Sequence, residues 1–591
     1  MSRFSTHLLP TNYHLLTTLN ALTLLLAAVG LRCCLLGNIP GCNGDEAWYG
    51  VQAWRAMHGE PFCWQTPTGN PLNGLFLGPL ALLHIWFAPS IALLRSVAVA
   101  SGLAALAVNW LLCRWVFDRR TAAISTVVLA ILPIDIAYSR FAWDACQSLA
   151  ATLPVVYLAI ASVRFPSRFG RWIAAAVVAQ IVAVWVHPTN VFACAAIVAA
   201  VAAQWALPTT GETQPSNDAF RRRSFAAGRW WVAAAALVTI GAGLWAMNLS
   251  RTPLPGRIAQ RFGDLRELVQ PHDLPHFSVL YARLFTGGTI YRYIAGSRSW
   301  FEWPLPENLD GWGLDVGLFW LCILGSAWLL WHCTPHAPRE AVQCTPHAPR
   351  EVVQCTPHAP REVVPPNLTR SVRSTILCAR ADRVLLATWA LGLVTFLLIA
   401  GPRAMAPGEE RFTICLIGPA VLLASRGAAL GCEAAAPRWR MALAAGALLG
   451  WFVLADFHEH YFRFIQRTGG EAHLTFRTAE VEPKEAALQY ILDRRSAGPT
   501  AICCSQWWNL WPIRYLALPE REIIVVEDLA AKTPIDQTAV PKQGQTWHVE
   551  FYGTEAQQRL EARFAGRGPQ QTTLADYAGR PILCVLQADA K

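Results

Sequence analysis

Long runs of apolar residues, separated by short polar segments, follow one another from Leu15 to Leu454. A helix of about 20 apolar residues spans the hydrocarbon core of a bilayer, which is roughly 30 Å thick. We therefore predict a mainly α, polytopic transmembrane helical bundle of about eleven spans. The predicted spans are residues 15–36, 91–113, 121–138, 145–163, 172–187, 190–207, 230–247, 314–332, 384–401, 412–430 and 441–457.

One further apolar run, residues 71–87, is short and is broken by Gly74, Gly78 and Pro79. We interpret it as an interfacial or re-entrant segment that does not cross the membrane. The first outer loop would then carry two interfacial segments, because residues 44–55 also have a surface pattern.

Residues 44–55 directly follow the first span and have the pattern of an amphipathic helix. Trp48, Val51 and Trp54 recur at every third position and give the helix one apolar, aromatic face. A helix of this kind can lie flat on a membrane, with its tryptophans at the level of the headgroups.

The distribution of arginine supports this count of spans. With a cytoplasmic N-terminus, the short inside segments hold thirteen arginines: Arg114, Arg119, Arg120, Arg164, Arg168, Arg171, Arg221, Arg222, Arg223, Arg229, Arg426, Arg438 and Arg440. The short outside segments hold five: Arg55, Arg95, Arg140, Arg403 and Arg411. Positive residues gather on the cytoplasmic side of membrane proteins, so we predict a multi-pass protein of the inner (plasma) membrane. The net charge of +10 is then a property of loops among membrane lipids, and no nucleic-acid partner is expected.

After Leu454 the sequence becomes mixed polar and apolar, and all four lysines of the chain lie in this part. Helical patterns at 483–495 and 554–564 alternate with strand-like segments at 501–505, 523–527, 547–551 and 582–586. We predict a transmembrane domain over 1–460 and a small C-terminal α/β domain over 466–591. An odd number of crossings makes this second domain extracytoplasmic.

A segment beginning Cys333-Thr334-Pro335-His336 recurs twice with a period of eleven residues. Its Cys and His invite a metal-binding interpretation. The closely spaced prolines and near-identical copies instead favour an extended cytoplasmic linker over 333–365.

Ionisable residues at the ends of spans gather on the predicted outer side. They are Asp45 and Glu46, Arg140 with Asp144, His187, and Glu410 with Arg411. Ionisable groups are costly at membrane depth, so they usually line a cavity or a pathway. For Asp45 and Glu46 a structural alternative exists, because Asp is a good N-cap and Glu suits the positive end of a helix.

Taken in order, several motifs resemble the GT-C superfamily of membrane glycosyltransferases, specifically the protein O-mannosyltransferase and aminoarabinose-transferase branch. The motifs are Asp45-Glu46-Ala47-Trp48-Tyr49, Leu94-Arg95, Phe117-Asp118-Arg119-Arg120, residues 133–144 (PIDIAYSRFAWD), and Glu410-Arg411-Phe412 with Pro419. The resemblance covers about residues 1–165 and is patchy beyond them.

The resemblance implies transfer of a hexosyl or pentosyl group, with inversion, from a polyprenyl-phosphate sugar to an extracytoplasmic lipid, protein or polysaccharide acceptor. Asp45 matches the first-loop acid and would be the general base. Glu46 would assist or orient it. Asp144 matches the second outer acid and would bind the acceptor, a metal or a partner arginine.

A leaving phosphate needs cationic donors. No lysine precedes Lys484, whereas relatives use lysine there, so arginine must supply the charge. Our candidates are Arg140 and Arg411, followed by Arg292 and Arg298 next to the Gly287-Gly288 pair.

Structural alternatives accompany these candidates. Arg140 could pair with Asp144 four residues on, and Arg411 could anchor its span at the interface. Tyr49 could stack on a sugar or simply pack, and His187 could bind phosphate or metal or be structural.

Two other functional classes remain alternatives: a lipid-linked sugar flippase or transporter, and a non-catalytic membrane binding protein. Transporters often have matching halves with broken helices at the midplane, and the sequence lacks this pattern. No cofactor is assigned, and a divalent metal held by the outer acids stays an open alternative.

Overall fold

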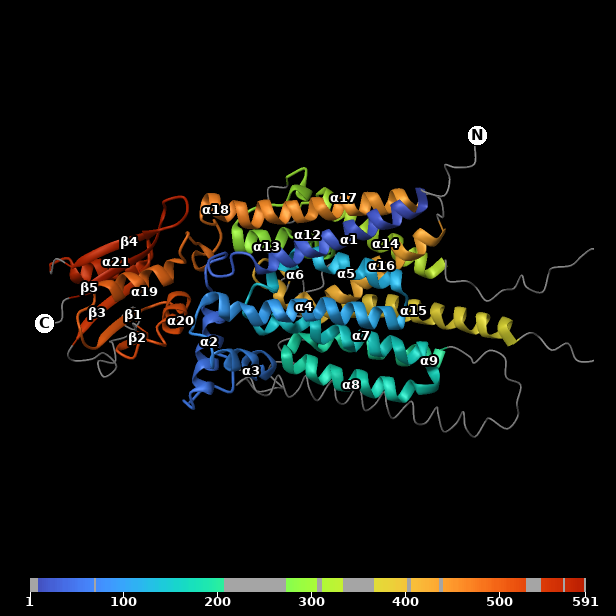
Figure 1. The fold of residues 1–591 in the computed structure, drawn as a ribbon, viewed down its shortest axis with the longest axis horizontal. Helices are drawn as coiled ribbons and strands as arrows, with labels where there is room; N and C mark the ends of the chain where they lie inside the picture. Colours follow the sequence, from blue (N-terminus) through green and yellow to red (C-terminus); the bar gives the residue numbers. More distant parts are fainter. Residues whose placement is uncertain are drawn as a thin grey trace, which may run out of the picture.

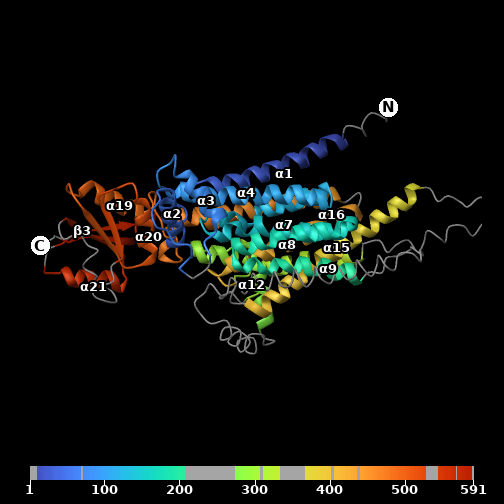
Figure 2. The same ribbon diagram turned by 90° about the horizontal axis from the view of Figure 1, so that it is seen from below.

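The computed structural model describes residues 9–67, 71–206, 273–305, 311–332, 366–400, 405–434, 439–527, 544–566 and 569–588. The predicted span 230–247 and the repeat-bearing segment 333–365 lie outside these residues. Within them the chain forms a bundle of long helices with a small sheet domain at one end (Figures 1 and 2).

The bundle is built from long helices and shorter ones that end or connect them. Its helices are α1 (Leu9–Cys33), α4 (Ile91–Val116), α5 (Arg119–Ile131), α6 (Pro133–Tyr138), α7 (Ser148–Arg164), α8 (Phe169–Val186), α9 (Ala195–Ala206), α12 (Asp273–Thr286), α13 (Gly288–Ile290), α14 (Leu314–His332), α15 (Pro366–Ala400), α16 (Ile417–Ala434), α17 (Trp439–Phe457) and α18 (Phe464–Thr468).

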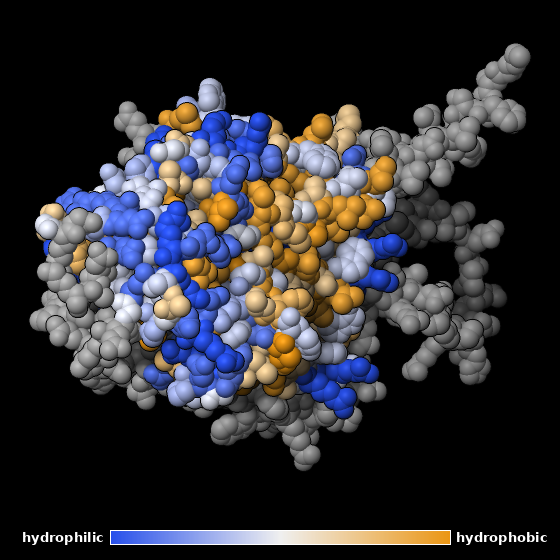
Figure 3. Space-filling view, turned by 60° about the vertical axis from the view of Figure 1, so that its left-hand side comes forward, coloured by the Kyte–Doolittle hydropathy of each residue, from blue (hydrophilic) through white to orange (hydrophobic). Residues whose placement is uncertain are grey.

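Seven helical stretches in the described ranges are long and apolar enough to cross a membrane: Ile91–Val116, Asp144–Arg164, Pro166–Val186, Pro188–Trp205, Leu314–His332, Leu377–Ala400 and Glu410–Cys432. Large apolar side chains such as Leu321 and Leu111, 73% and 62% exposed, lie on the outside of the bundle. Hydrophobic residues form a band over it in Figure 3, and hydrophilic residues cover the sheet domain. The protein is therefore a multi-pass membrane protein.

The predicted total of about eleven spans stays a prediction. One predicted span, residues 121–138, is divided into α5 and α6 at Pro133. Proline has no amide hydrogen, so it cannot continue the hydrogen bonding of α5 and instead begins the next helix. The 13 residues of α5 measure about 20 Å, less than the hydrocarbon core.

Two helices between α1 and α4, α2 (Gly44–Met57) and α3 (Gly74–Leu83), lie at the end of the bundle nearest the sheet domain (Figure 1). With ten residues, α3 is too short to cross a bilayer. The predicted surface helix forms, but its apolar face packs on protein. Trp48 and Val51 are buried with Phe76 of α3, Leu94 of α4 and Tyr515 of the sheet domain.

The C-terminal domain has a five-stranded sheet of order β2-β1-β3-β5-β4. Its elements are α19 (Pro483–Arg494), β1 (Thr500–Cys504), α20 (Trp507–Leu516), β2 (Ile523–Glu527), β3 (Gln545–Phe551), α21 (Glu555–Phe564), β4 (Gln570–Ala575) and β5 (Pro581–Ala588). The central strand β1 pairs in parallel with β2 and β3, while β5 pairs antiparallel with β3 and β4.

Successive side chains of β3 point to opposite faces of the sheet. Trp547 and Val549 join the core that α19 and α20 cover. His548 points to the other face, where its ring lies 5.4 Å from that of Phe564 on α21. The sequence patterns located the other elements but missed α20 and β4.

Candidate active site

Segments far apart in the sequence bring charged and aromatic side chains together where the bundle meets the C-terminal domain. We call this group the outer cluster: Asp45, Tyr49, Trp143, Asp144, His187, Tyr293, Arg411 and Trp507. It combines three of the six residues predicted to bind substrate, Tyr49, His187 and Arg411, with two of the three predicted acids, Asp45 and Asp144.

Asp45 lies in the first turn of α2 and is half-buried. Asn43, not Asp45, is the N-cap, and its side-chain oxygen accepts the Asp45 amide at 2.8 Å. The structural alternative for Asp45 is therefore wrong. Its Oδ1 instead accepts a hydrogen bond of 2.9 Å from the indole Nε1 of Trp507, in the C-terminal domain.

Burial raises the pKa of Asp45 above its ordinary value. The Trp507 hydrogen bond and the Arg411 charge oppose this effect, while Asp144 and Glu46 add to it. A half-buried carboxylate with a raised pKa is a stronger base than a free one, and this is the property that a general base needs.

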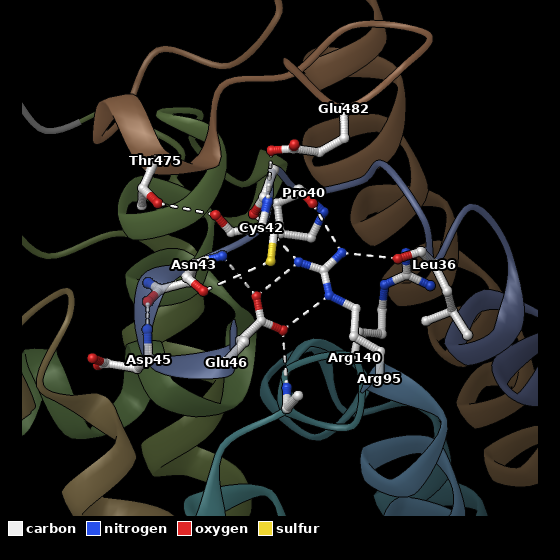
Figure 4. Close-up of polar contacts among 12 residues, drawn as sticks. Leu36, Pro40, Cys42, Asn43, Asp45, Glu46, Arg95, Arg140, Thr475 and Glu482 are labelled. Atoms are coloured by element: carbon white, nitrogen blue, oxygen red, sulfur yellow. Dashed lines mark hydrogen bonds and ion pairs between the residues drawn. The ribbon is translucent and has the colours of Figure 1, made fainter. Parts of the chain in front are cut away.

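Glu46 is fully buried and completes the capping box of α2 (Figure 4). Its two oxygens accept hydrogen bonds of 2.9 and 2.8 Å from Arg95 on α4. They also accept the backbone amides of Asn43, at 3.0 Å, and Ala142, at 2.9 Å. The Asn43 contact closes the first turn of α2, and the other three hold that turn against α4 and Ala142. The predicted role of Glu46, to assist or orient Asp45, stays a prediction.

Asp144 begins a short 3₁₀ turn, Asp144–Gln147, and is half-buried. Burial and then the Asp144 charge raise the pKa of Tyr49 well above its ordinary value. The Tyr49 ring is buried and lies edge-on to Trp48 and Phe76, at 5.2 and 5.3 Å between ring centroids. Packing of this kind covers the ring and leaves its hydroxyl end toward Asp144.

Arg411 is the cation of the outer cluster. Its side chain is 28% exposed, and its guanidinium lies over the rings of Trp143, at 5.2 Å, and Phe412, at 5.0 Å. Glu409 is 3.7 Å away, and the charge of Arg411 also acts on Asp45. A partly exposed guanidinium beside a carboxylate and over aromatic rings is well placed to take an anion.

His187 lies beside Asp144 and Arg411 but is almost fully buried. Its Nδ1 is 2.7 Å from Thr189 Oγ1 and also accepts the Thr189 amide at 3.4 Å. It thus caps the 3₁₀ turn that begins at Pro188.

Arg140 is fully buried away from the surface of the cluster. Its guanidinium donates to the backbone carbonyls of Leu31, at 2.7 Å, Cys34, at 2.6 Å, and Ile39, at 2.7 Å. These contacts fix the chain between α1 and α2, and they use the donors that a phosphate would need. The predicted ion pair between Arg140 and Asp144 does not form.

Arg292 and Arg298 flank Tyr293 in a segment that packs against α17. Arg292 forms an ion pair with buried Glu302. Arg298 is exposed and precedes Ser299, which donates to Asp456 of α17 at 2.9 Å. Tyr293 is the residue of this segment that reaches the outer cluster, where it is affected by the charges of Arg411 and Asp45.

The sequence interpretation did not single out Trp143, Tyr293 or Trp507. Trp143 adjoins Asp144, and Tyr293 lies in the glycine-flanked segment, so proximity to chosen residues was a usable signal for both. Trp507 lies 462 residues from Asp45, and no local pattern connects the two.

Within the described parts of the chain, no three His, Cys, Asp or Glu side chains are grouped as a metal-binding set. A divalent metal at the outer acids therefore stays an open alternative.

No protein-family model matches this sequence, and no curated protein matches it significantly. Solved structures do resemble the fold. ArnT from Cupriavidus metallidurans bound to undecaprenyl phosphate matches at 13% identity and a TM-score of 0.42, over 98% of both chains. The Archaeoglobus fulgidus oligosaccharyltransferase AglB with an inhibitory peptide and a dolichol-phosphate matches at 14% identity and 0.41, over 90% of this chain and 69% of AglB.

A third match, the mycobacterial arabinofuranosyltransferase AftD, has 15% identity and a TM-score of 0.32, over 97% of this chain and 40% of AftD. All three are GT-C glycosyltransferases. These matches agree with the resemblance expected from the sequence, but with TM-scores below 0.5 they carry no argument for it. At these low TM-scores, we base the function on the residues of the outer cluster.

Proposed function

We propose that this protein is a membrane glycosyltransferase that moves a hexosyl or pentosyl group from a polyprenyl-phosphate sugar to an extracytoplasmic acceptor. The observation that carries the proposal is Asp45. It is half-buried at the start of α2, has no capping role, and faces both Asp144 and Arg411.

The reaction that fits this arrangement is a direct displacement. The acceptor oxygen attacks the anomeric carbon from the face opposite the phosphate, and the bond between that carbon and the phosphate oxygen breaks. The Asp45 carboxylate takes the acceptor proton, while the phosphate leaves with the bonding electron pair. One displacement inverts the configuration at the anomeric carbon.

Arg411 is our choice to stabilise the leaving phosphate, in place of Arg140. Beneath it lie two buried donors, the Trp143 indole and the Tyr138 hydroxyl, which lack a hydrogen-bond partner among the described residues. Positioned donors that meet developing negative charge are the main source of stabilisation in such sites. His187, beside Arg411 and Asp144, has the structural role of capping the 3₁₀ turn that begins at Pro188.

The Tyr49 hydroxyl lies toward Asp144, and we assign both residues to the acceptor. A carboxylate at that position can accept a hydrogen bond from an acceptor hydroxyl without competing for the phosphate. Glu46 acts through its hold on α2.

We assign the outer cluster and the C-terminal domain to the extracytoplasmic side of the inner membrane, an orientation that the distribution of arginine supports. A polyprenyl chain would then lie along the apolar band of the bundle, with its phosphate at Arg411. Two of the similar proteins were solved with undecaprenyl phosphate or dolichol-phosphate.

The proposal is tested by incubating the purified protein in liposomes with radiolabelled undecaprenyl-phosphate sugars. We expect one donor to be consumed, with release of undecaprenyl phosphate and inversion in the product. Donor that moves across the bilayer unconsumed would support the flippase alternative. Donor that binds but is neither consumed nor moved across the bilayer would support the alternative of a non-catalytic binding protein.

A further inference from the structure

The hydrogen-bond partner of Asp45 comes from a different domain. Trp507 is the first residue of α20, and its Nε1 donates to Asp45 Oδ1 at 2.9 Å. Asp45 Oδ2 accepts no hydrogen bond from the described residues, so it is the better placed of the two oxygens to receive a proton. The Trp507 hydrogen bond therefore fixes the orientation of the Asp45 carboxylate.

The surface of α2 is shaped to receive α20. A Cβ atom at Gly44 would lie 2.6 Å from Trp507, and a Cβ atom at Gly50 would lie 2.6 Å from the ring of Tyr515. The two glycines thus let both ends of α20, at Trp507 and Tyr515, approach the backbone of α2 closely. The Tyr515 hydroxyl also donates to the carbonyl of Ser90, at 3.4 Å.

The segment that leads into α2 is held by both domains (Figure 4). From the bundle, Arg95 donates to the Pro40 carbonyl at 2.9 Å. From the C-terminal side, Glu482 accepts the Cys42 amide at 3.1 Å, and Thr475 donates to the Cys42 carbonyl at 3.2 Å. The first turn of α2 is consequently fixed relative to α20, and so is the Trp507–Asp45 hydrogen bond.

We infer that Trp507 is a positioning residue for the general base, so that the C-terminal domain completes the catalytic site. This inference rests on the proposed function. The indole N–H fixes the carboxylate and favours its charged form, because a hydrogen bond to the charged form stabilises it. The domain thus has a direct role in the reaction, separate from any part in choosing the acceptor.

Five other titratable or charged groups face Asp45 or its oxygens. Arg411 favours the charged carboxylate, whereas Asp144 and Glu46 oppose it. Tyr49 and Tyr293 are neutral at ordinary pH, since burial raises the pKa of both. None of these groups is altered by changing the indole alone.

The test is the pH profile of sugar transfer by the full chain, with Trp507→Phe compared to Trp508→Phe. Phenylalanine keeps an aromatic ring and removes the N–H. Trp508 lies next in sequence and packs near His473, at 5.4 Å between rings, so it is a matched control. The probes are radiolabelled undecaprenyl-phosphate sugars, with Asp45→Asn as a third variant.

Loss of the indole hydrogen bond raises the pKa of Asp45, and the base is active only when deprotonated. We expect the acid limb of the Trp507→Phe profile to move up by about one pH unit. Activity of Trp507→Phe should fall several-fold on the acid limb of the profile and largely return at alkaline pH, while Trp508→Phe keeps the wild-type profile.

An equal loss at every pH would overturn the inference, because it would show a purely structural role for Trp507. So would an unchanged Trp507→Phe profile, even with Asp45→Asn inactive, and the proposed function would then still stand. Full activity of Asp45→Asn would remove the general-base role of Asp45 and this inference with it, while sugar transfer itself would stand. No donor consumed by the wild type would remove the proposed function as well.

Discussion

Asp45 and Glu46 are adjacent in the sequence but have different environments. Glu46 is fully buried and accepts four hydrogen bonds, whereas Asp45 is half-buried and accepts one from Trp507. The helix-start pattern predicted two acids at this position. It could not show which one is committed to the fold, because Arg95 lies 49 residues beyond Glu46.

The contrast predicts that loss of the Glu46 charge destabilises the protein and that loss of the Asp45 charge does not. In Glu46→Gln the buried Arg95 charge loses its counter-charge, and loss of one partner from a buried pair costs about 3–5 kcal/mol. We expect a clear drop in the melting temperature of the detergent-solubilised protein, whereas Asp45→Asn should melt close to wild type. Equal melting temperatures for wild type and Glu46→Gln would contradict the role assigned to Glu46.

Arg411 should matter for transfer more than for folding. Removing one positioned donor to developing charge typically costs about 3 kcal/mol, or roughly a hundred-fold in rate. We therefore expect Arg411→Gln to lower kcat/KM about a hundred-fold at an unchanged melting temperature. Arg463→Gln, which removes an exposed arginine paired with Glu459, is the control and should be near wild type. Equal activity of the two variants would count against Arg411.

Most helices and strands could be predicted from periodicity, but the elements that each of them packs against could not. The pattern of α2 predicted an apolar face, but α20, which covers it, lies in another domain. α20 itself was missed because it is rich in tryptophan and contains Pro512. β4 was missed because its polar, mostly exposed residues lack an apolar alternation.

The contact between α2 and α20 predicts that one glycine on α2 is essential. In Gly50→Ala the added methyl would lie 2.6 Å from the Tyr515 ring, so α20 must shift. We expect faster cleavage between the domains by a protease and reduced transfer. Gly78→Ala on α3 is the matched control, since a Cβ there meets nothing within 4 Å and alanine favours helix. Similar cleavage rates for both variants would show that the helices are less closely packed.

For the whole molecule, length and apolarity predicted a membrane bundle and a polar C-terminal domain. The number of membrane spans was harder to predict, because the apolar run at 121–138 is interrupted by Pro133 and forms two helices. The outer cluster combines residues from both ends of the chain, so only the bundle residues that lie near a motif could be chosen from the sequence.

The orientation predicts the behaviour of reporter fusions. A phosphatase active only outside the cytoplasm should be active when fused after residue 591 and inactive when fused after residue 118. The reverse pattern would place the outer cluster in the cytoplasm, where an extracytoplasmic acceptor could not reach it.

The central claim is that Asp45 removes the acceptor proton during sugar transfer. The most direct measurement is the rate of transfer from undecaprenyl-phosphate sugars by Asp45→Asn, with Glu60→Gln as an exposed acidic control at the same end of the molecule. General-base catalysis contributes about 10²–10⁴-fold. The account predicts a loss of at least a hundred-fold in Asp45→Asn, at an unchanged melting temperature, and none in Glu60→Gln. Transfer by Asp45→Asn at the wild-type rate would contradict it.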